Sequence, residues 1–181
     1  MNAFIEPPKK TNILLRLGIW FSEKVTGRVM LPARLLAWYP KAALGSGLLE
    51  ALVAHQDGKL DARMLKLVRM AASFAAACPF CIDMNSYEHE DLNINAQEVA
   101  ALRGQSELAS VNSLTARERL AIEYARLVSQ TPLKFHPDFI AQLKDQFSER
   151  EIVILASTAA QVNYWARLIQ ALGIPPAGFS G

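Results

Sequence analysis

Three capping boxes constrain the fold of this chain most strongly, because each one marks the start of a helix. They are Asn95-x-x-Glu98, Thr115-x-x-Glu118 and Ser148-x-x-Glu151. In such a box the first side chain accepts a backbone N–H three residues on, and the glutamate side chain bonds back to the first residue. Apolar residues follow each box at helical spacing. The second half of the chain is therefore predicted to be helical, and its last helix should run from about 149 to 172.

The first half of the chain has the same helical period. Thr11 is predicted to cap a helix that ends near Gly27, and prolines interrupt residues 30–40, which we expect to form a loop with short helical turns. Further helices are predicted over 41–55, before an Asp57-Gly58 turn, and over 62–77, 78–91 and 137–147. No stretch combines strand alternation with hairpin turns. The predicted fold class is all-α.

The bulk composition excludes several classes of protein. The chain has 181 residues, which fits one compact domain with an N-terminal extension, and a formal net charge of +2. That charge is too small, and its lysines and arginines too scattered, to indicate a nucleic-acid partner. The apolar run 13–21 contains Arg16 and is too short to span a bilayer, and the first ten residues lack the pattern of a signal peptide. We expect a cytoplasmic protein without membrane association.

The only two cysteines form a C-P-F-C unit, Cys78 to Cys81, at the predicted start of a helix. Pro79 suits the first position of that helix, and a helix start lowers the pKa of a thiol. A redox dithiol is the favoured interpretation, although a pair of inert buried thiols and half of a zinc site, completed by His55, His89 or His136, remain alternatives. The glutaredoxin fold is set aside because the sequence offers no βαβ unit around the motif.

Three segments around and after this motif resemble one known superfamily. "LDARMLKLVRMAASFAAACPFCIDMNS", "LTARERLAIEYARLV" and "FSEREIVILASTAAQVNYWARLIQALGIPPAGF" are similar to the carboxymuconolactone decarboxylase and alkylhydroperoxidase D superfamily, and the last segment resembles its peroxidase-related branch. The resemblance covers roughly residues 30–179. It implies an AhpD-like helical domain over 31–181, an N-terminal helical extension over 1–30, and assembly into homotrimers or hexamers through helix packing.

The resemblance also implies a mechanism and a departure from it. In the redox members a glutamate lies twelve positions before the first cysteine and a histidine four after the second, and these two residues relay protons. The resemblance makes Cys81 the thiol that attacks peroxide and Cys78 the resolving thiol. Lys66 stands at the glutamate position and Asn85 at the histidine position. Neither can serve as that relay, since asparagine does not titrate and lysine is normally protonated.

Lys66 and Asn85 nevertheless suit a thiolate site. A lysine near the cysteines would favour the thiolate form, and Asn85, one turn after Cys81, could donate a hydrogen bond to it. The sequence therefore predicts a thiol-dependent oxidoreductase that carries out disulfide exchange or slow hydroperoxide reduction. Its partners would be a hydroperoxide or disulfide substrate and an unidentified thiol reductant, without a cofactor or metal.

Residues around the motif are assigned structural roles. His89 is expected to be solvated, Asp83 to be an exposed or capping carboxylate, and Tyr87 to lie in the core or an interface. Asn163 and Arg167 share one helix face and are expected to anchor a helix–helix or subunit contact, with a place beside the dithiol as the alternative. Two other functions stay open: a decarboxylase-like enzyme acting on a lactone acid, and a helical oligomer without catalysis.

Overall fold

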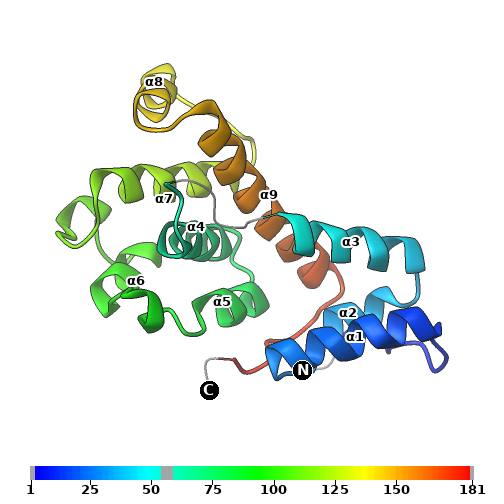
Figure 1. Ribbon diagram of the computed structural model, residues 1–181. Helices are drawn as coiled ribbons and strands as arrows, with labels where there is room; N and C mark the ends of the chain where they lie inside the picture. The colour runs from blue at the N-terminus through cyan, green and yellow to red at the C-terminus, as the bar shows by residue number, and fades with distance from the viewer. Residues whose placement is uncertain (1–2, 54–58, 180–181) are drawn as a thin grey trace.

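The computed structural model describes residues 3–53 and 59–179, and the elements of these residues are all helices, as predicted (Figure 1). The predicted Asp57-Gly58 turn and His55 lie outside the described residues. The elements are α1 (Ile13–Thr26), α2 (Leu31–Leu36), α3 (Pro40–Leu52), α4 (Ala62–Ala75), α5 (Pro79–Ser86), α6 (Ala96–Leu102), α7 (Ala116–Val128), α8 (Pro137–Gln146) and α9 (Glu149–Ala171), with short 3₁₀ helices at Glu90–Leu92 and Leu108–Ser110.

The three capping boxes are confirmed. Both reciprocal hydrogen bonds of each box are present at the starts of α6, α7 and α9. The predicted cap of α1 is wrong by one residue, because the side chain of Asn12, not that of Thr11, accepts the backbone N–H of Leu14 at 2.8 Å. Asn12 still has a non-helical ψ of 143°, so the helix begins only after it. The helix starts follow from local hydrogen bonds of this kind.

Helix α4 lies at the centre of the fold and packs against α5, α7 and α9 (Figure 1). Leu67, Val68, Met70, Ala71 and Ala72 are fully buried on it. These buried positions are spread around the helix, so α5, α7 and α9 pack on different sides of α4. The residues that follow α4 are thus held against the core, and these residues carry the cysteines.

Helix α5 is shorter than predicted. It ends at Ser86 rather than near residue 91, and Glu88 adopts a left-handed conformation with φ of 53°. The carbonyl oxygen of Tyr87 accepts a hydrogen bond from the Lys66 side chain of α4 instead of continuing the helix. This contact joins residues 21 positions apart, so a local sequence pattern could not show where α5 ends.

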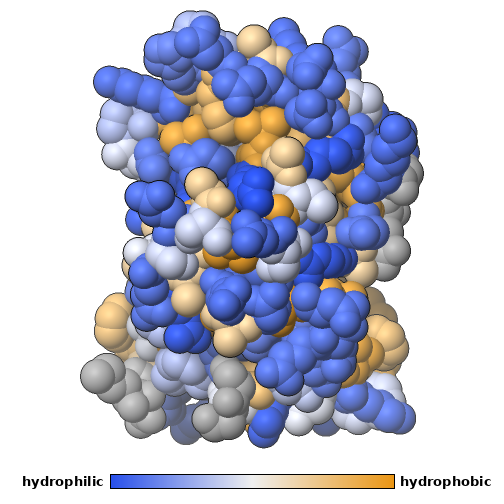
Figure 2. All heavy atoms as spheres, turned by 90° about the vertical axis from the view of Figure 1, so that its left-hand side faces the viewer, coloured by the Kyte–Doolittle hydropathy of each residue, from blue (hydrophilic) through white to orange (hydrophobic). Residues whose placement is uncertain are grey.

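Helices α1 and α3 both lie on the right-hand side of Figure 1 and expose apolar side chains. No residue of α1 is buried, and Ser46 is the buried residue of α3. The opposite side of the molecule, shown in Figure 2, carries mostly hydrophilic side chains with smaller apolar patches between them. The exposed apolar residues of the two helices, here called the α1/α3 face, are Ile13, Leu14, Leu17, Trp20, Phe21, Val25, Leu44, Leu48 and Leu52.

The residues before α1 are attached to the end of α9. The backbone N–H of Phe4 donates to the carbonyl oxygen of Leu172 at 3.0 Å, and the Phe4 ring lies over Gly173. Gly173 has φ of 63°, and a Cβ there would approach that ring to 2.5 Å, so glycine is required on two counts. The predicted division into an extension over 1–30 and a domain over 31–181 stays a prediction. None of the described helices has the length and apolar character that a membrane span needs.

Candidate functional site

The two cysteines lie at a sharp break between α4 and α5. Ala77 adopts a left-handed conformation with φ of 47°, which turns the chain between the helices. Cys78 is the N-cap of α5, and its sulfur accepts the backbone N–H of Cys81 at 3.3 Å, while Pro79 occupies the first helical position. The predicted helix start at the cysteine motif is therefore confirmed.

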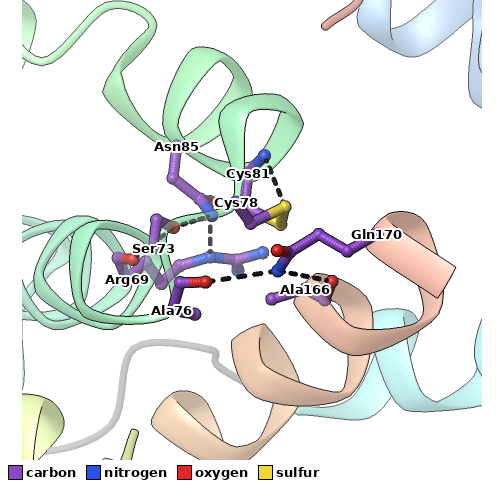
Figure 3. The surroundings of a disulfide bond; sticks show 8 residues. All are labelled: Arg69, Ser73, Ala76, Cys78, Cys81, Asn85, Ala166 and Gln170. Atoms are coloured by element: carbon purple, nitrogen blue, oxygen red, sulfur yellow. Dashed lines mark hydrogen bonds between the residues drawn. A yellow bond between two sulfur atoms is a disulfide. The ribbon is translucent and has the colours of Figure 1, made fainter. Parts of the chain in front are cut away.

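Cys78 and Cys81 are joined by a disulfide in the structure (Figure 3). Their Cα atoms are 5.2 Å apart, a usual separation for disulfide-bonded residues. The exposed fraction is 0% for Cys78 and 3% for Cys81. Within residues 3–53 and 59–179, no group of three His, Cys, Asp or Glu side chains is arranged to hold a metal ion.

An apolar cluster surrounds the disulfide, separate from the main core around α4. Side chains from α2, α5, α9 and the segment after α9 build it, so distant parts of the chain meet over the cysteines. Besides the two cysteines, its buried members are Met30, Leu35, Ala76, Phe80, Ala166, Ile169, Ile174 and Phe179. The sulfurs are therefore covered by apolar side chains from several elements.

Asp83 holds the C-terminal segment over α5. Its carboxylate accepts the backbone N–H groups of Gly178 at 2.8 Å and Phe179 at 3.0 Å, and the residue is 9% exposed. The expectation of an exposed or helix-capping carboxylate is therefore wrong. The Phe179 ring also packs against the ring of Tyr87. Tyr87, 39% exposed, thus lies at the edge of this contact rather than in the core.

Asn85 joins α5 to α4 beside the disulfide. Its side-chain N–H donates to the hydroxyl of Ser73 at 2.9 Å, and its side-chain oxygen accepts from Nε of Arg69 at 3.2 Å (Figure 3). Ser73 in turn donates to the carbonyl oxygen of Arg69 at 2.7 Å, and its own carbonyl accepts the N–H of Cys78. The amide of Asn85 is thus engaged by α4, and the hydrogen bonds of this amide fix the position of α5.

Lys66 is directed to the other end of α5. Its ammonium group donates to the carbonyl oxygen of Tyr87 at 2.5 Å. Tyr87 follows Cys81 by six residues, about 9 Å along a helix axis at 1.5 Å per residue. Burial lowers the pKa of Lys66 and the charge of Arg69 lowers it further, which outweighs the opposing effect of nearby carboxylates. Arg69, one turn nearer the cysteines, is the cationic side chain that contacts Asn85.

A glutamate on α3 completes this hydrogen-bonded network. One oxygen of Glu50 accepts from Nη2 of Arg69 at 3.1 Å, and the other accepts from Gln161 at 2.8 Å and from the indole N–H of Trp165 at 2.9 Å. Arg69, Ser73 and Glu50 are not among the residues predicted from the sequence. A signal existed for the first two, since they follow Lys66 at steps of three and four residues along one face of α4.

The remaining candidates fall outside this network. Asn163 donates to the hydroxyl of Ser129 and to the carbonyl of Ala159, each at 2.9 Å, so its predicted role as a helix–helix anchor is confirmed. Arg167 is exposed on α9. His89 is half-buried rather than fully solvated, and its Nδ1 lies 2.8 Å from the carbonyl oxygen of Ser86.

Gln170 is a further neighbour of the disulfide that the sequence did not indicate. Its side-chain N–H groups donate to the carbonyl oxygens of Ala76 at 3.2 Å and Ala166 at 3.0 Å. Figure 3 shows its amide on the α9 side of the cysteines. It ties the end of α4 to α9, just before the turn that carries Cys78.

Sequence comparison finds one matching family and two relatives. Residues 43–127 match the family described as the carboxymuconolactone decarboxylase family. The protein YnjA of Escherichia coli K12 is 26% identical over 179 residues, which cover 96% of this chain and 94% of YnjA. The protein YdfG of Bacillus subtilis 168 is 25% identical over 109 residues, 60% of this chain and 72% of YdfG.

Solved structures have the same fold. A peroxidase-related protein with an alkylhydroperoxidase AhpD core, from Ralstonia eutropha JMP134, superposes with a TM-score of 0.81 at 15% identity over 97% of this chain and 93% of that one. The debrominase Bmp8, solved in complex with 2,3,4-tribromopyrrole, superposes with a TM-score of 0.77 at 19% identity, over 96% of this chain and 91% of Bmp8. Residues 43–127 thus match the carboxymuconolactone decarboxylase family, and the fold is that of the AhpD-like structures, in agreement with the resemblance of the sequence motifs.

Proposed function

We propose that this protein is a thiol-dependent oxidoreductase whose Cys78–Cys81 pair cycles between dithiol and disulfide while it reduces a hydroperoxide or a disulfide substrate. The observation that carries the proposal is the place of the pair. Both cysteines lie at the first turn of α5, with Cα atoms 5.2 Å apart, so the disulfide closes within one helical turn. The names of related structures, which include a peroxidase-related protein, support the reaction class.

The proposed chemistry assigns one step to each cysteine. The Cys81 thiolate attacks the hydroperoxide, whose O–O bond breaks to give an alcohol and a sulfenic acid. The Cys78 thiolate then displaces water from that sulfenic acid and forms the disulfide. In total, two thiols and one hydroperoxide give one disulfide, one alcohol and one water. The backbone N–H of Cys81, which donates to the Cys78 sulfur, favours the thiolate that the second step needs.

Two features support a slow peroxidase or a disulfide-exchange enzyme rather than a fast peroxidase. The cysteines are buried below the segment that Asp83 holds, so the substrate must wait for that cover to move. In addition, Lys66 is engaged by Tyr87, and Asn85 by Arg69 and Ser73. Neither stands ready to protonate the alcohol as it leaves, so water is left as the proton donor.

A stoichiometric oxidation tests this function. The reduced protein is treated with one equivalent of an organic hydroperoxide, and its cysteine peptides are then mapped by mass spectrometry. We expect a Cys78–Cys81 disulfide with the loss of two hydrogens, and one equivalent of alcohol. Thiols that stay reduced in the folded protein would overturn the proposal and favour a decarboxylase-like enzyme or a helical oligomer without catalysis.

A second copy of this chain is the partner that we propose for the α1/α3 face. Monomeric proteins rarely expose a contiguous apolar patch of more than a few hundred Å². Leu17, Trp20, Phe21 and Leu48 of this face are each at least 56% exposed. Covering it against another copy would remove these side chains from water, and α3 also carries Glu50, so assembly would reach the network beside the cysteines.

Sedimentation velocity tests the assembly. The wild type should sediment as a homo-oligomer, and Trp20→Glu should lower its mass, because a carboxylate in a buried apolar contact is strongly unfavourable. Val153→Glu is the matched control, since Val153 is 62% exposed on α9 and outside the α1/α3 face. A monomeric wild type at micromolar concentration would contradict this assignment.

A further inference from the structure

One cation, Arg69, contacts a residue that neighbours the disulfide. Figure 3 shows the guanidinium of Arg69 reaching from α4 into the space between Asn85 and Gln170. Its Nε donates to Asn85, which lies one turn after Cys81 on the same face of α5. Arg69 is 21% exposed in its side chain, so water screens its charge only in part.

We propose that Arg69 is the cation that stabilises the reactive thiolate of the Cys78–Cys81 pair, and that Glu50 is the positioning residue that holds Arg69 there. This inference rests on the proposed dithiol chemistry and assigns its electrostatic part. Lys66, at the position of the family's glutamate, does not stabilise the thiolate in this proposal; Arg69, one turn further along α4, does. Glu50, Arg69 and Asn85 form a hydrogen-bonded chain that supplies a positive charge but transfers no proton.

Geometry distinguishes Arg69 from Lys66. The Lys66 ammonium is bound to the carbonyl of Tyr87, at the end of α5 away from the cysteines. Arg69 is held from both sides, by Asn85 at 3.2 Å and by Glu50 at 3.1 Å. A guanidinium remains protonated throughout the pH range in which a thiol titrates, so its charge is constant while the thiol ionises.

Glu50 keeps Arg69 in place because its own carboxylate is fixed. The oxygen that does not contact Arg69 accepts two hydrogen bonds from α9, from Gln161 and Trp165. Gln161 is 1% exposed, so this contact is buried on the α9 side, although the Glu50 side chain itself is 40% exposed. Glu50 therefore holds the guanidinium on the side of α3.

Other charged groups on the surrounding elements are engaged elsewhere or exposed. They include Arg34 on α2, Lys66 on α4, Asp83 on α5 and Arg167 on α9, while Arg63 of α4 pairs with Glu98 and Glu118. Arg34 pairs with Glu23, and Asp83 accepts two backbone N–H groups of the C-terminal segment. Arg167 is exposed on α9, and the side chain of that helix beside the disulfide is the neutral Gln170. Arg69 is therefore the charged side chain of α4 that contacts Asn85 beside the cysteines.

The thiol pKa measures this role directly. In the reduced protein, the alkylation rate of each cysteine is followed from acidic to alkaline pH by mass spectrometry. An opposite charge nearby lowers a pKa by about 1–3 units, so Arg69→Gln should raise the pKa of the reactive thiol by about one unit or more. Arg69→Lys should restore part of the difference, and Glu50→Gln should give a smaller rise in the same direction.

Lys66→Gln is the decisive comparison, because it removes a cation of the same helix one turn away. It should change the thiol pKa clearly less than Arg69→Gln does, with urea unfolding used to confirm that each variant is folded. Equal shifts in the two variants, or an unchanged pKa in Arg69→Gln and Glu50→Gln, would overturn the role of Arg69. If Arg69→Gln does not fold, the thiol pKa values of Arg69→Lys and Glu50→Gln are compared with that of Lys66→Gln instead, and unchanged values would overturn the role of Arg69.

The outcome separates this inference from the proposed function. If hydroperoxide converts the wild type to the disulfide but the thiol pKa is unchanged in Arg69→Gln, the proposed function stands and the role of Arg69 is wrong. If the thiol pKa shifts in Arg69→Gln but hydroperoxide leaves the wild type reduced, the role of Arg69 stands and the proposed function is wrong.

Discussion

Replacing Cys81 with serine should reduce hydroperoxide turnover by roughly 10³-fold or more, because a hydroxyl without an activating base is a poor substitute for a thiolate. The variant should fold normally, since the backbone N–H of residue 81 still donates to Cys78. Turnover is measured with dithiothreitol as reductant and an organic hydroperoxide as oxidant. Activity at the wild-type level in Cys81→Ser would show that another group attacks the peroxide.

The companion variant Cys78→Ser should react once and stop. Serine is a preferred N-cap, so it can replace the sulfur that accepts the N–H of Cys81 and leave α5 intact. Without a resolving thiol, the sulfenic acid at Cys81 should persist and be trapped by dimedone. If the acid is instead trapped at Cys78 in the Cys81→Ser variant and not in this one, the two roles are exchanged.

The second large effect concerns stability. Arg63 joins α4 to α6 and α7: its Nη2 contacts Glu98 at 2.6 Å and its Nε contacts Glu118 at 2.7 Å. The side chain of Glu98 is 0% exposed. Arg63→Met should lower the free energy of unfolding by about 3–5 kcal/mol, because it leaves a buried carboxylate without its partner. Urea unfolding with circular dichroism detection measures this change.

A surface pair on the same fold provides the control. Arg34 contacts Glu23 at 2.6 Å, but the Arg34 side chain is 43% exposed. Arg34→Met should cost only about 0–1 kcal/mol, the usual range for exposed pairs. Equal losses in the two variants would mean that burial of Glu98 does not determine the effect.

The Glu98 carboxylate also makes the stability of the protein depend on pH. Burial raises the pKa of Glu98, but hydrogen bonds from Arg63, the Asn95 backbone and Ser113 lower it by more, so the pKa lies below its ordinary value. A lowered pKa in the folded state stabilises the protein above the unfolded pKa of about 4.3, and this contribution disappears as the pH falls through the folded value. In Arg63→Met, the free energy of unfolding should therefore fall less steeply as the pH is lowered than it does in the wild type.

The sequence predicted those parts of the fold that depend on neighbouring residues. Asn95, Thr115 and Ser148 begin their helices because each cap and its glutamate are only three residues apart. The break at Cys78 was also predictable, since Pro79 marks the helix start. In each case the stabilising contact lies inside one helical turn, where a sequence pattern contains all of its parts.

The remainder depends on contacts between distant residues. Asp83 receives its hydrogen bonds from residues 95 and 96 positions later, so nothing local showed that it would be buried. Glu50 contacts Arg69 across 19 residues and Gln161 across 111. The position of Lys66 in the motif indicated a place near the cysteines, yet the carbonyl of Tyr87, freed by the end of α5, binds it instead.

A redox titration tests the central claim, which is that Cys78 and Cys81 interconvert as one unit. The protein is equilibrated in buffers with varied ratios of reduced to oxidised dithiothreitol, and its free thiols are alkylated and counted by intact mass. We expect a single reversible transition between molecules with two labels and molecules with none. Two labels at every ratio, in folded protein, would contradict it.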